Sequence, residues 1–333
     1  MRIFIIALSA LALLLCGAAN AAEKSARPEY RISGPYTHKN LCIFLIHGPD
    51  KVKGRKFLVL QEAMDQKVVV VSETSNVNQL MIENKGDVDV YIQSGEIVKG
   101  GKQDRTIAFD IIIPARSGKK PLDAFCVEHG RWQQRGSESA VAFNSSDYAI
   151  AGKDLKLAVR GSSQQAVWES VAKQQDKLSE NVGGDVRAAQ SASSFQLTLE
   201  NKNLGKLTDE YVKALAGTPE GKDDVIGYAF AIDGKVNSID IYANADLFHK
   251  LWPKLIRTSS VEAISEGKKD AKFTEATVAD VKQCMADAEQ GQAKEKTVGE
   301  RVKMRTVDAA AAVKFEMRDE QSGEALHENY IKK

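Results

Sequence analysis

The segment DVDVYIQSGEIVKGGKQDRTIAFDIII, residues 87–113, decides the fold class of this chain. It holds two stretches, 87–92 and 106–113, in which apolar side chains recur at every second position. A period of two is that of a β-strand, because successive side chains point to opposite faces of a sheet. The two stretches therefore predict two strands, joined by a connection that carries three glycines and five charged residues between positions 95 and 105.

Strand patterns continue through the rest of the first half of the chain. Apolar or β-branched runs predict further strands over 40–47, 67–72, 79–83 and 125–128. Apolar residues at helical spacing predict a short helix within 57–65, and the basic segment 114–121 has the composition of a loop.

The second half of the chain mixes both periodicities. Helical spacing of apolar residues predicts helices over 164–178, 208–216, 246–257 and 278–288. Ser162 or Ser163 is suited to cap the first of these helices, and Pro253 is expected to kink or restart the third.

Two further strand patterns lie in the second half. Asp233-Gly234 is the turn pair of a tight hairpin between strands predicted over 227–232 and 235–242. Residues 311–318 alternate as another strand. All the patterns together predict one large α+β domain, with a β-rich first half and mixed helices and hairpins in the second.

We place this domain at residues 36–333, with 266–333 either inside it or forming a C-terminal extension of it. Residues 22–35 are polar and contain proline, so we expect them to form a leader in front of the domain.

The N-terminus has the form of a signal peptide, residues 1–21. A positive start precedes an apolar run that is too short to span a bilayer, and Ala19-Asn20-Ala21 has the small-x-small form of a cleavage site. We therefore expect a periplasmic or secreted protein cleaved after Ala21, with no transmembrane span in the mature chain. A lipoprotein acylated at Cys16 is the less favoured alternative, because Leu15 is larger than the residue usual before such a cysteine.

The net charge of the chain argues against a nucleic acid as a partner. The formal charge of +1 gives no electrostatic footprint for a nucleic acid, so none is expected as a partner.

The mature chain keeps three cysteines, Cys42, Cys126 and Cys284. They allow at most one internal disulfide, and the sequence does not show which two would pair. The first two lie in apolar runs and are most simply buried small hydrophobic residues. The sequence leaves the oligomeric state open as well.

The glycine-rich connection is not a nucleotide-binding phosphate loop. That loop needs lysine directly after its last glycine, but Gly101 stands after Gly100 here, and Gln103 stands where a hydroxyl would bind magnesium. It must also open a helix, whereas a strand is predicted after residue 105.

Strand parity places two charged residues inward. Steps of two from Val88, Val90 and Ile92 reach Glu96, and steps of two back from Ile107 reach Arg105. A buried charge must be paired or hydrogen-bonded, so we predict an inward polar cluster at one end of the sheet.

The segment CVEHGRW, residues 126–132, adds similar side chains where the next strand ends. Arg131 is suited to bind a carboxylate or a phosphate with two hydrogen bonds, and Trp132 is suited to stack on a base. Two interpretations of these residues remain open. Glu96, Arg105, Glu128 and Arg131 form either an ion-pair network that fixes strand ends, or a pocket for an anionic small molecule in which Glu96 or Glu128 acts as general base.

Other catalytic chemistry finds little support in the sequence. The five histidines lack metal-ligand spacing, so no metal site is predicted, and no particular cofactor is indicated. Cys126 and His129 lie three positions apart, which puts them on opposite faces of a strand. The chain has no G-x-S-x-G motif. Trp168 and Trp252 lie in apolar helical stripes and are predicted to be core residues.

Four motifs resemble one bacterial family: SGEIVKGGKQDR (94–105), CVEHGRW (126–132), QQAVWESV (164–171) and DIYANADLFHKLWPKLIRTSSVEAI (240–264). The family is named for its association with ADP-ribosylglycohydrolase and rhodanese-phosphatase proteins. The resemblance runs from Leu41 to Ile264, and Leu326-His327 matches the family's closing strand.

The resemblance implies a role around ADP-ribose or other NAD-derived metabolites. It also extends the candidate ligand-binding set, which becomes Lys99, Gly100, Gly101, Gln103, Asp104, Arg105, Arg131 and Trp132. We therefore expect an exported protein that binds an anionic, nucleotide- or ADP-ribose-like small molecule at the Glu/Arg cluster. A non-catalytic envelope interaction protein, and a hydrolase with a carboxylate general base, are the alternatives.

Overall fold

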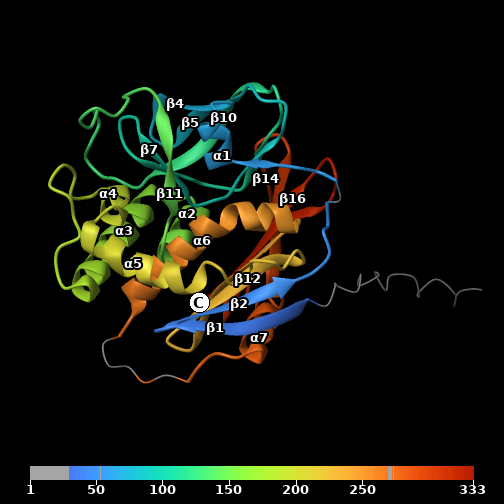
Figure 1. Ribbon diagram of the computed structural model, residues 1–333. Coiled ribbons are helices and arrows are strands. Elements are labelled where there is room, and N and C mark those ends of the chain that lie inside the picture. The colour runs from blue at the N-terminus through green and yellow to red at the C-terminus, as the bar shows by residue number, and fades with distance from the viewer. Residues whose placement is uncertain (1–29, 53, 269–271, 273) are drawn as a thin grey trace, which may run out of the picture.

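The computed structural model describes residues 30–333 except for positions 53, 269–271 and 273 (Figure 1). The predicted signal peptide, residues 1–21, lies outside the described residues. Among the helices of the described part, none has the length and apolar character needed to cross a membrane.

The larger sheet contains eight described strands, and every neighbouring pair is antiparallel. Its strands in spatial order are β1 Arg31–His38, β2 Leu41–His47, β12 Val225–Ile232, β13 Lys235–Tyr242, β17 Ala325–Lys332, β16 Ala312–Asp319, β15 Val302–Asp308 and β14 Gln292–Val298. The buried strand predicted over 40–47 and the hairpin around Asp233-Gly234 are both confirmed.

Two boundaries of the larger sheet differ from the sequence expectation. Strand β1 pairs with β2 from Arg31 onward, so the predicted leader 22–35 is wrong for its last residues, 31–35. Strand β17 inserts between β13 and β16. Residues 292–332 therefore complete the sheet and are integral to the domain, because without β17 the edge of β13 would lie unpaired.

The first half of the chain forms two smaller sheets. One has the described strands β11 Phe143–Ala149, β7 Glu96–Gly100, β8 Arg105–Ile107, β10 Gly118–Cys126, β5 Gln79–Asn84 and β4 Val69–Asn76, in that spatial order. The other has β3 Leu58–Val59, β6 Val90–Ile92 and β9 Ile111–Ile113. The loop predicted over 114–121 is wrong from Gly118 onward, because β10 begins there and pairs with β5 along a largely exposed stretch that suits its lysines.

The segment 87–113 forms more strands than its pattern predicted. Only Val90–Ile92 of the first predicted strand is extended, and the second predicted strand is split into β8 and β9. The two halves belong to different sheets, because β8 pairs with β7 and β10 whereas β9 pairs with β6. Asp110 lies directly before β9, in the break.

The described helices are α1 Leu60–Asp65, α2 Lys153–Arg160, α3 Gln164–Val182, α4 Phe195–Leu199, α5 Lys202–Leu215, α6 Ala245–Glu266 and α7 Val278–Ala288. Helix α6 crosses the middle of the molecule between the larger sheet and the smaller sheets, and α7 covers the other face of the larger sheet (Figure 1). The Ser163 side chain accepts a hydrogen bond from the amide of Ala166, so the predicted N-cap of α3 is confirmed.

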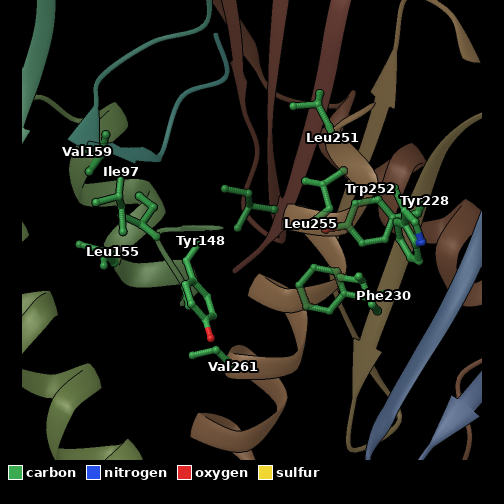
Figure 2. Packing of buried hydrophobic residues seen from close by; sticks show 14 of the residues in the cluster. Ile97, Tyr148, Leu155, Val159, Tyr228, Phe230, Leu251, Trp252, Leu255 and Val261 are labelled. Carbon is green, nitrogen blue, oxygen red and sulfur yellow. The ribbon is translucent and has the colours of Figure 1, made fainter. Parts of the chain in front are cut away.

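Helix α6 runs unbroken through Pro253, so the predicted restart at this proline is wrong. Proline removes one helical hydrogen bond, but buried side chains on both sides, Trp252 and Leu255, anchor the two halves in the core. Figure 2 shows both side chains beside Tyr228 and Phe230 of β12, and the ring centroids of Tyr228 and Trp252 are 5.4 Å apart. The same apolar cluster includes Ile97 of β7, so this core joins the larger sheet to the six-stranded sheet.

Candidate functional site

The glycine-rich connection closes a hairpin between β7 and β8, in which Val98 lies opposite Arg105. Gly100 and Gly101 both have positive φ, 124° and 55°. A Cβ on Gly101 would come within 2.2 Å of the Phe143 ring, so only glycine lets the backbone pass this close to β11.

Glu96 and Arg105 are both buried, but they do not pair with each other. Glu96 lies at the far end of β7, and its Oε2 is 2.6 Å from Nζ of Lys254 on α6. Arg105 donates to the carbonyl of Gln103 at 2.8 Å, and its Nη2 is 3.6 Å from Oε2 of Glu73 on β4. The inward orientation of both charges was predicted correctly, and their partners come from α6 and β4.

Asp104, Glu128, Arg131 and Arg135 form one buried ion-pair network, which we call the Asp104 network. Arg135 reaches both oxygens of Asp104, with distances of 2.8 Å to Oδ2 and 3.0 Å to Oδ1. Arg131 Nε lies 2.7 Å from Oε1 of Glu128, whose Oε2 accepts from the amide of Asp104 at 3.0 Å. Arg131 also donates to the carbonyls of Gly100 and Gly101.

The two carboxyl groups of this network respond differently to burial. Burial raises the pKa of Asp104, and the bond from Arg135 offsets only part of this effect. Burial also raises the pKa of Glu128, but bonds from Arg131 and other donors outweigh it, so the net direction is downward. Each carboxylate already has several donors, including Ser194 Oγ at 2.8 Å from Asp104, which favours the structural interpretation of Glu128 and Arg131.

The remaining predicted ligand-binding residues lie around the Asp104 network. Lys99 Nζ is 2.6 Å from Glu200, and the Gln103 side chain donates to the carbonyl of Glu128 at 3.0 Å. Trp132 is 43% exposed, and the Arg105 guanidinium lies 5.7 Å from its ring centroid. Arg105 is the unusual member of the group, because its Nε and Nη2 have no hydrogen-bond partner among the described residues.

Among the described residues, Cys42, Cys126 and Cys284 are buried and free, which confirms the expectation for the first two. Burial raises the pKa of the Cys126 thiol to about 11, and its Sγ lies 3.1 Å from Oε1 of Gln103. Such a thiol is neutral near pH 7 and is no nucleophile. Trp252 is a core residue as predicted, whereas Trp168 is only half-buried and packs edge-on against His129.

A second buried polar group lies where the layers meet. His327 of β17 stands between two carboxylates, with Nδ1 2.6 Å from Oδ2 of Asp110 and Nε2 3.0 Å from Oδ1 of Asp240. Tyr91 Oη donates to Asp110 at 2.6 Å, and Asn329 donates to Asp240 at 2.8 Å. We call Asp110, Asp240 and His327 the His327 cluster. Its three side chains come from a break between two small-sheet strands and from two neighbouring strands of the larger sheet.

The His327 cluster holds a charged imidazole in the protein interior. Burial lowers the pKa of His327, but Asp110 and Asp240 outweigh this effect and raise it to about 9. Burial raises the pKa of Asp110, yet the charge of His327 holds it well below its usual range. Both ring nitrogens therefore donate a proton to a carboxylate at neutral pH. In the part of the chain that the structure describes, no group of histidine, cysteine and acidic residues is arranged to hold a metal ion.

A cavity of about 40 Å³ adjoins this cluster, and we call it the central cavity. Its lining includes Gln93, Ser94, Lys156, Arg160, Asp240 and Asn329. Lys156 pairs with the fully buried carboxylate of Glu262, and Arg160 Nη2 lies 3.6 Å from Asp110. The Arg160 side chain is only 6% exposed, yet its Nη1 has no hydrogen-bond partner among the described residues. Buried polar donors normally have a partner, so this nitrogen is available to donate to an oxygen atom in the cavity.

A family model matches residues 29–331 of the chain, and its description is ARG and Rhodanese-Phosphatase-superfamily-associated Protein domain. The chain belongs to this family. The finding confirms the family that the sequence motifs resembled, and the match covers residues on both sides of the stretch from Leu41 to Ile264. No curated protein and no solved structure matches the chain.

The sequence patterns of this ARPP-1 domain did not predict the His327 cluster, because they did not reveal the break in the chain beside Asp110. Residues 106–113 were read as one strand, in which Asp110 would face away from the apolar side chains. The break between β8 and β9 turns Asp110 inward, where it is fully buried. One sequence feature could have revealed the cluster, namely the single aspartate in the apolar run Ala108-Phe109-Asp110-Ile111. A charge buried among apolar side chains needs a partner.

Proposed function

We propose that this protein binds a small ligand with an anionic oxygen, a carboxylate or a phosphate, in the central cavity. The observation that carries the proposal is the buried Nη1 of Arg160, which lacks a hydrogen-bond partner among the described residues and belongs to a residue that lines the cavity. An unsatisfied buried donor costs about 1–3 kcal/mol, and more if charged, so a ligand oxygen that accepts from it gains much of that free energy.

The rest of the cavity lining supports the same class of ligand. Lys156 adds a second cation, and the contacts that Asp240 accepts from described residues, His327 and Asn329, are at Oδ1. Its Oδ2 remains to accept a hydrogen bond from a ligand hydroxyl. A hydroxy acid or a sugar phosphate presents both an anionic oxygen and a hydroxyl group.

The size of the cavity limits what it takes. A volume of about 40 Å³ exceeds that needed for one water molecule, but it does not enclose a whole dinucleotide. The ligand is therefore a small acid, or a larger molecule such as ADP-ribose that inserts only a phosphate-bearing end.

Isothermal titration of the mature protein tests this proposal with inorganic phosphate, glycerate, ribose 5-phosphate and ADP-ribose as probes. We expect Arg160→Gln to weaken binding by at least about tenfold, since one charged hydrogen bond is worth about 1.5–3 kcal/mol. Arg116→Gln is the matched control, because Arg116 lies on the surface. Equal affinity in Arg160→Gln and the wild type, or no binding of any probe by the folded wild type, would overturn the proposal.

The Glu/Arg cluster is the second candidate site, and one observation favours it. Arg105 is fully buried with two nitrogens lacking hydrogen-bond partners among the described residues, and it lies beside the exposed ring of Trp132. This pair suits a ligand with an anionic group and a base. The same titrations distinguish the two sites: loss of binding in Arg105→Gln with retention in Arg160→Gln assigns the ligand to the Glu/Arg cluster.

We also propose that the protein is exported, because residues 1–21 have the form of a cleavable signal peptide. Cell fractionation and sequencing of the mature N-terminus test this. Ala22 as the first residue of a periplasmic or secreted protein is the expected result. An acylated Cys16 at the N-terminus would replace it with the lipoprotein alternative, and an intact Met1 in the cytoplasm would refute export.

A further inference from the structure

A third polar group lies at one end of the larger sheet, apart from both sites above. Ser33 Oγ is 2.7 Å from Nε2 of His47, and Nδ1 of His47 is 2.8 Å from Oδ1 of Asp224. We propose that Ser33, His47 and Asp224 form a nucleophilic triad that hydrolyses small carboxylic esters. Such triads are recognised by the geometry and roles of their members, and they occur on unrelated folds without a shared sequence motif.

Strand register brings the three residues together. In the β1–β2 pair, Arg31 lies opposite His47 and Ser33 opposite Leu45, so Ser33 is a diagonal neighbour of His47 on one face of the sheet. On the other side of β2, His47 lies opposite Val225 of β12. Asp224 directly precedes that residue. The arrangement therefore rests on three neighbouring strands and not on a flexible loop alone.

The atoms of the triad have the order that the chemistry requires. A hydrogen bond from His47 holds the pKa of Asp224 below its usual value, with a further contribution from Arg31, so Asp224 is a carboxylate at neutral pH. With Nδ1–H donating to this carboxylate, Nε2 is free of a proton and accepts from the hydroxyl of Ser33.

Arg31 completes the support of the carboxylate. Its Nη2 lies 2.6 Å from Oδ2 of Asp224 and 2.8 Å from Nδ1 of His47. Arginine can only donate, so the contact of Nη2 with Nδ1 competes with the bond from Nδ1–H to Asp224, and the triad acts in the tautomer in which Nδ1 carries the proton. Arg31 is a positioning residue in this arrangement, because it acts through Asp224.

The triad is accessible to a substrate. Ser33, His47 and Asp224 line an open surface cavity of about 520 Å³ together with Tyr36 and Lys222. Lys222 adds a cation to the lining, with Nζ 5.8 Å from the ring centroid of Tyr36, and the Tyr36 ring offers an apolar wall for an acyl group. The Asp224 side chain is 55% exposed, so solvent screens its effect on His47. We therefore expect slow turnover, best seen with activated esters.

The reaction needs only the ester and water. Ser33 Oγ attacks the ester carbonyl carbon while its proton moves to Nε2 of His47. The bond to the alcohol oxygen then breaks, and the alcohol leaves with that proton, which produces an acyl-Ser33. Water adds to the acyl group through the same proton transfers, releases the carboxylic acid and restores Ser33.

The first test is covalent labelling of the full mature protein with a fluorophosphonate probe, followed by peptide mass spectrometry. We expect one label, on Ser33, and no labelling of Ser33→Ala. Ser137→Ala, which changes an exposed serine, is the matched control and should label like the wild type. A label on another residue, or no label on the folded wild type, would overturn the proposal.

The second test is the hydrolysis of p-nitrophenyl acetate. We expect His47→Gln to lower the rate by about 100-fold, the usual lower range for loss of a general base. Asp224→Asn should lower it as well, and Ser33→Ala should abolish it. Equal rates in Ser33→Ala and the wild type would show that the ester reacts elsewhere. Arg116→Gln changes an exposed arginine outside both sites, so its ester hydrolysis should stay at the wild-type rate.

Discussion

Nδ1 of His327 and Oδ2 of Asp110 lie 2.6 Å apart, and this contact joins β17 of the larger sheet to the break between two strands of the smaller sheets. The pair brings together residues that are 217 positions apart in the sequence. Because both side chains are buried, their charges compensate each other in the interior, and the stability of the fold depends on the protonation of His327.

The first prediction concerns the pH dependence of stability. The pKa of His327 is raised from 6.5 in the unfolded chain to about 9 in the folded protein. Its contribution is therefore fully present below pH 6.5 and is lost as the pH rises through about 9. We expect a loss on the order of 3 kcal/mol across this window, measured by urea unfolding. His327→Gln should be less stable at pH 6 and should lack this slope, and an equal slope in both proteins would contradict the prediction.

The second prediction concerns Gly101. Gly101→Ala should destabilise the protein by about 1–3 kcal/mol beyond the backbone cost, because the new methyl group would displace the ring of Phe143. Gly136→Ala is a matched control, since Gly136 has nearly the same φ, 54° against 55°, with no atom within 4 Å of an added Cβ. Thermal unfolding should rank the stabilities as wild type, Gly136→Ala and Gly101→Ala. Equal losses in both variants would mean that the close approach to Phe143 carries no energetic weight.

The third prediction concerns the Asp104 network. Arg135→Met removes the two-pronged partner of Asp104 and leaves a buried carboxylate without its main counter-charge, so a loss of about 3–5 kcal/mol is expected. Arg116→Met breaks a pair on the surface with Asp87 and should leave the unfolding midpoint unchanged. Urea unfolding measures the free energy of unfolding of both variants. A small loss in Arg135→Met would contradict the prediction, because it would mean that water can hydrogen-bond to Asp104 in place of Arg135.

The fourth prediction concerns the contact between α6 and β7. Lys254→Met leaves Glu96 buried and unpaired, and we expect a loss of about 3–5 kcal/mol in urea unfolding. The double variant Lys254→Met with Glu96→Leu should recover part of this loss, because both charges are then gone. The single variant Glu96→Leu completes the comparison. If the loss in the double variant equals the sum of the losses in the two single variants, Glu96 and Lys254 do not interact energetically.

Much of the fold could be predicted from the sequence, because its patterns are local. The hairpin at Asp233-Gly234, the N-cap at Ser163 and the α+β class all follow from turn chemistry, capping and periodicity. The same local patterns also favoured a kink or restart at Pro253, whereas the helix runs unbroken because burial of the flanking side chains overrides the lost hydrogen bond.

The candidate site was harder to predict, because parity gives the direction of a side chain and not its partner. Both Glu96 and Arg105 turn inward as predicted, but the residues that meet them, Lys254 and Glu73, come from elements whose packing the sequence does not reveal. Arg135 and His327 illustrate the same difficulty, since their partners lie 31 and 217 positions away. Each such pairing is a property of the assembled layers.

The insertion of β17 between β13 and β16 has a consequence for synthesis of the protein on the ribosome. While residues 325–332 are still inside the exit tunnel, β13 lacks a neighbour on one side, and Asp110 and Asp240 lack the imidazole that neutralises them. The nascent chain therefore cannot complete its central layers until this strand has emerged. During that interval the edge of β13 is open to pairing with other strands, and the arrival of β17 closes it.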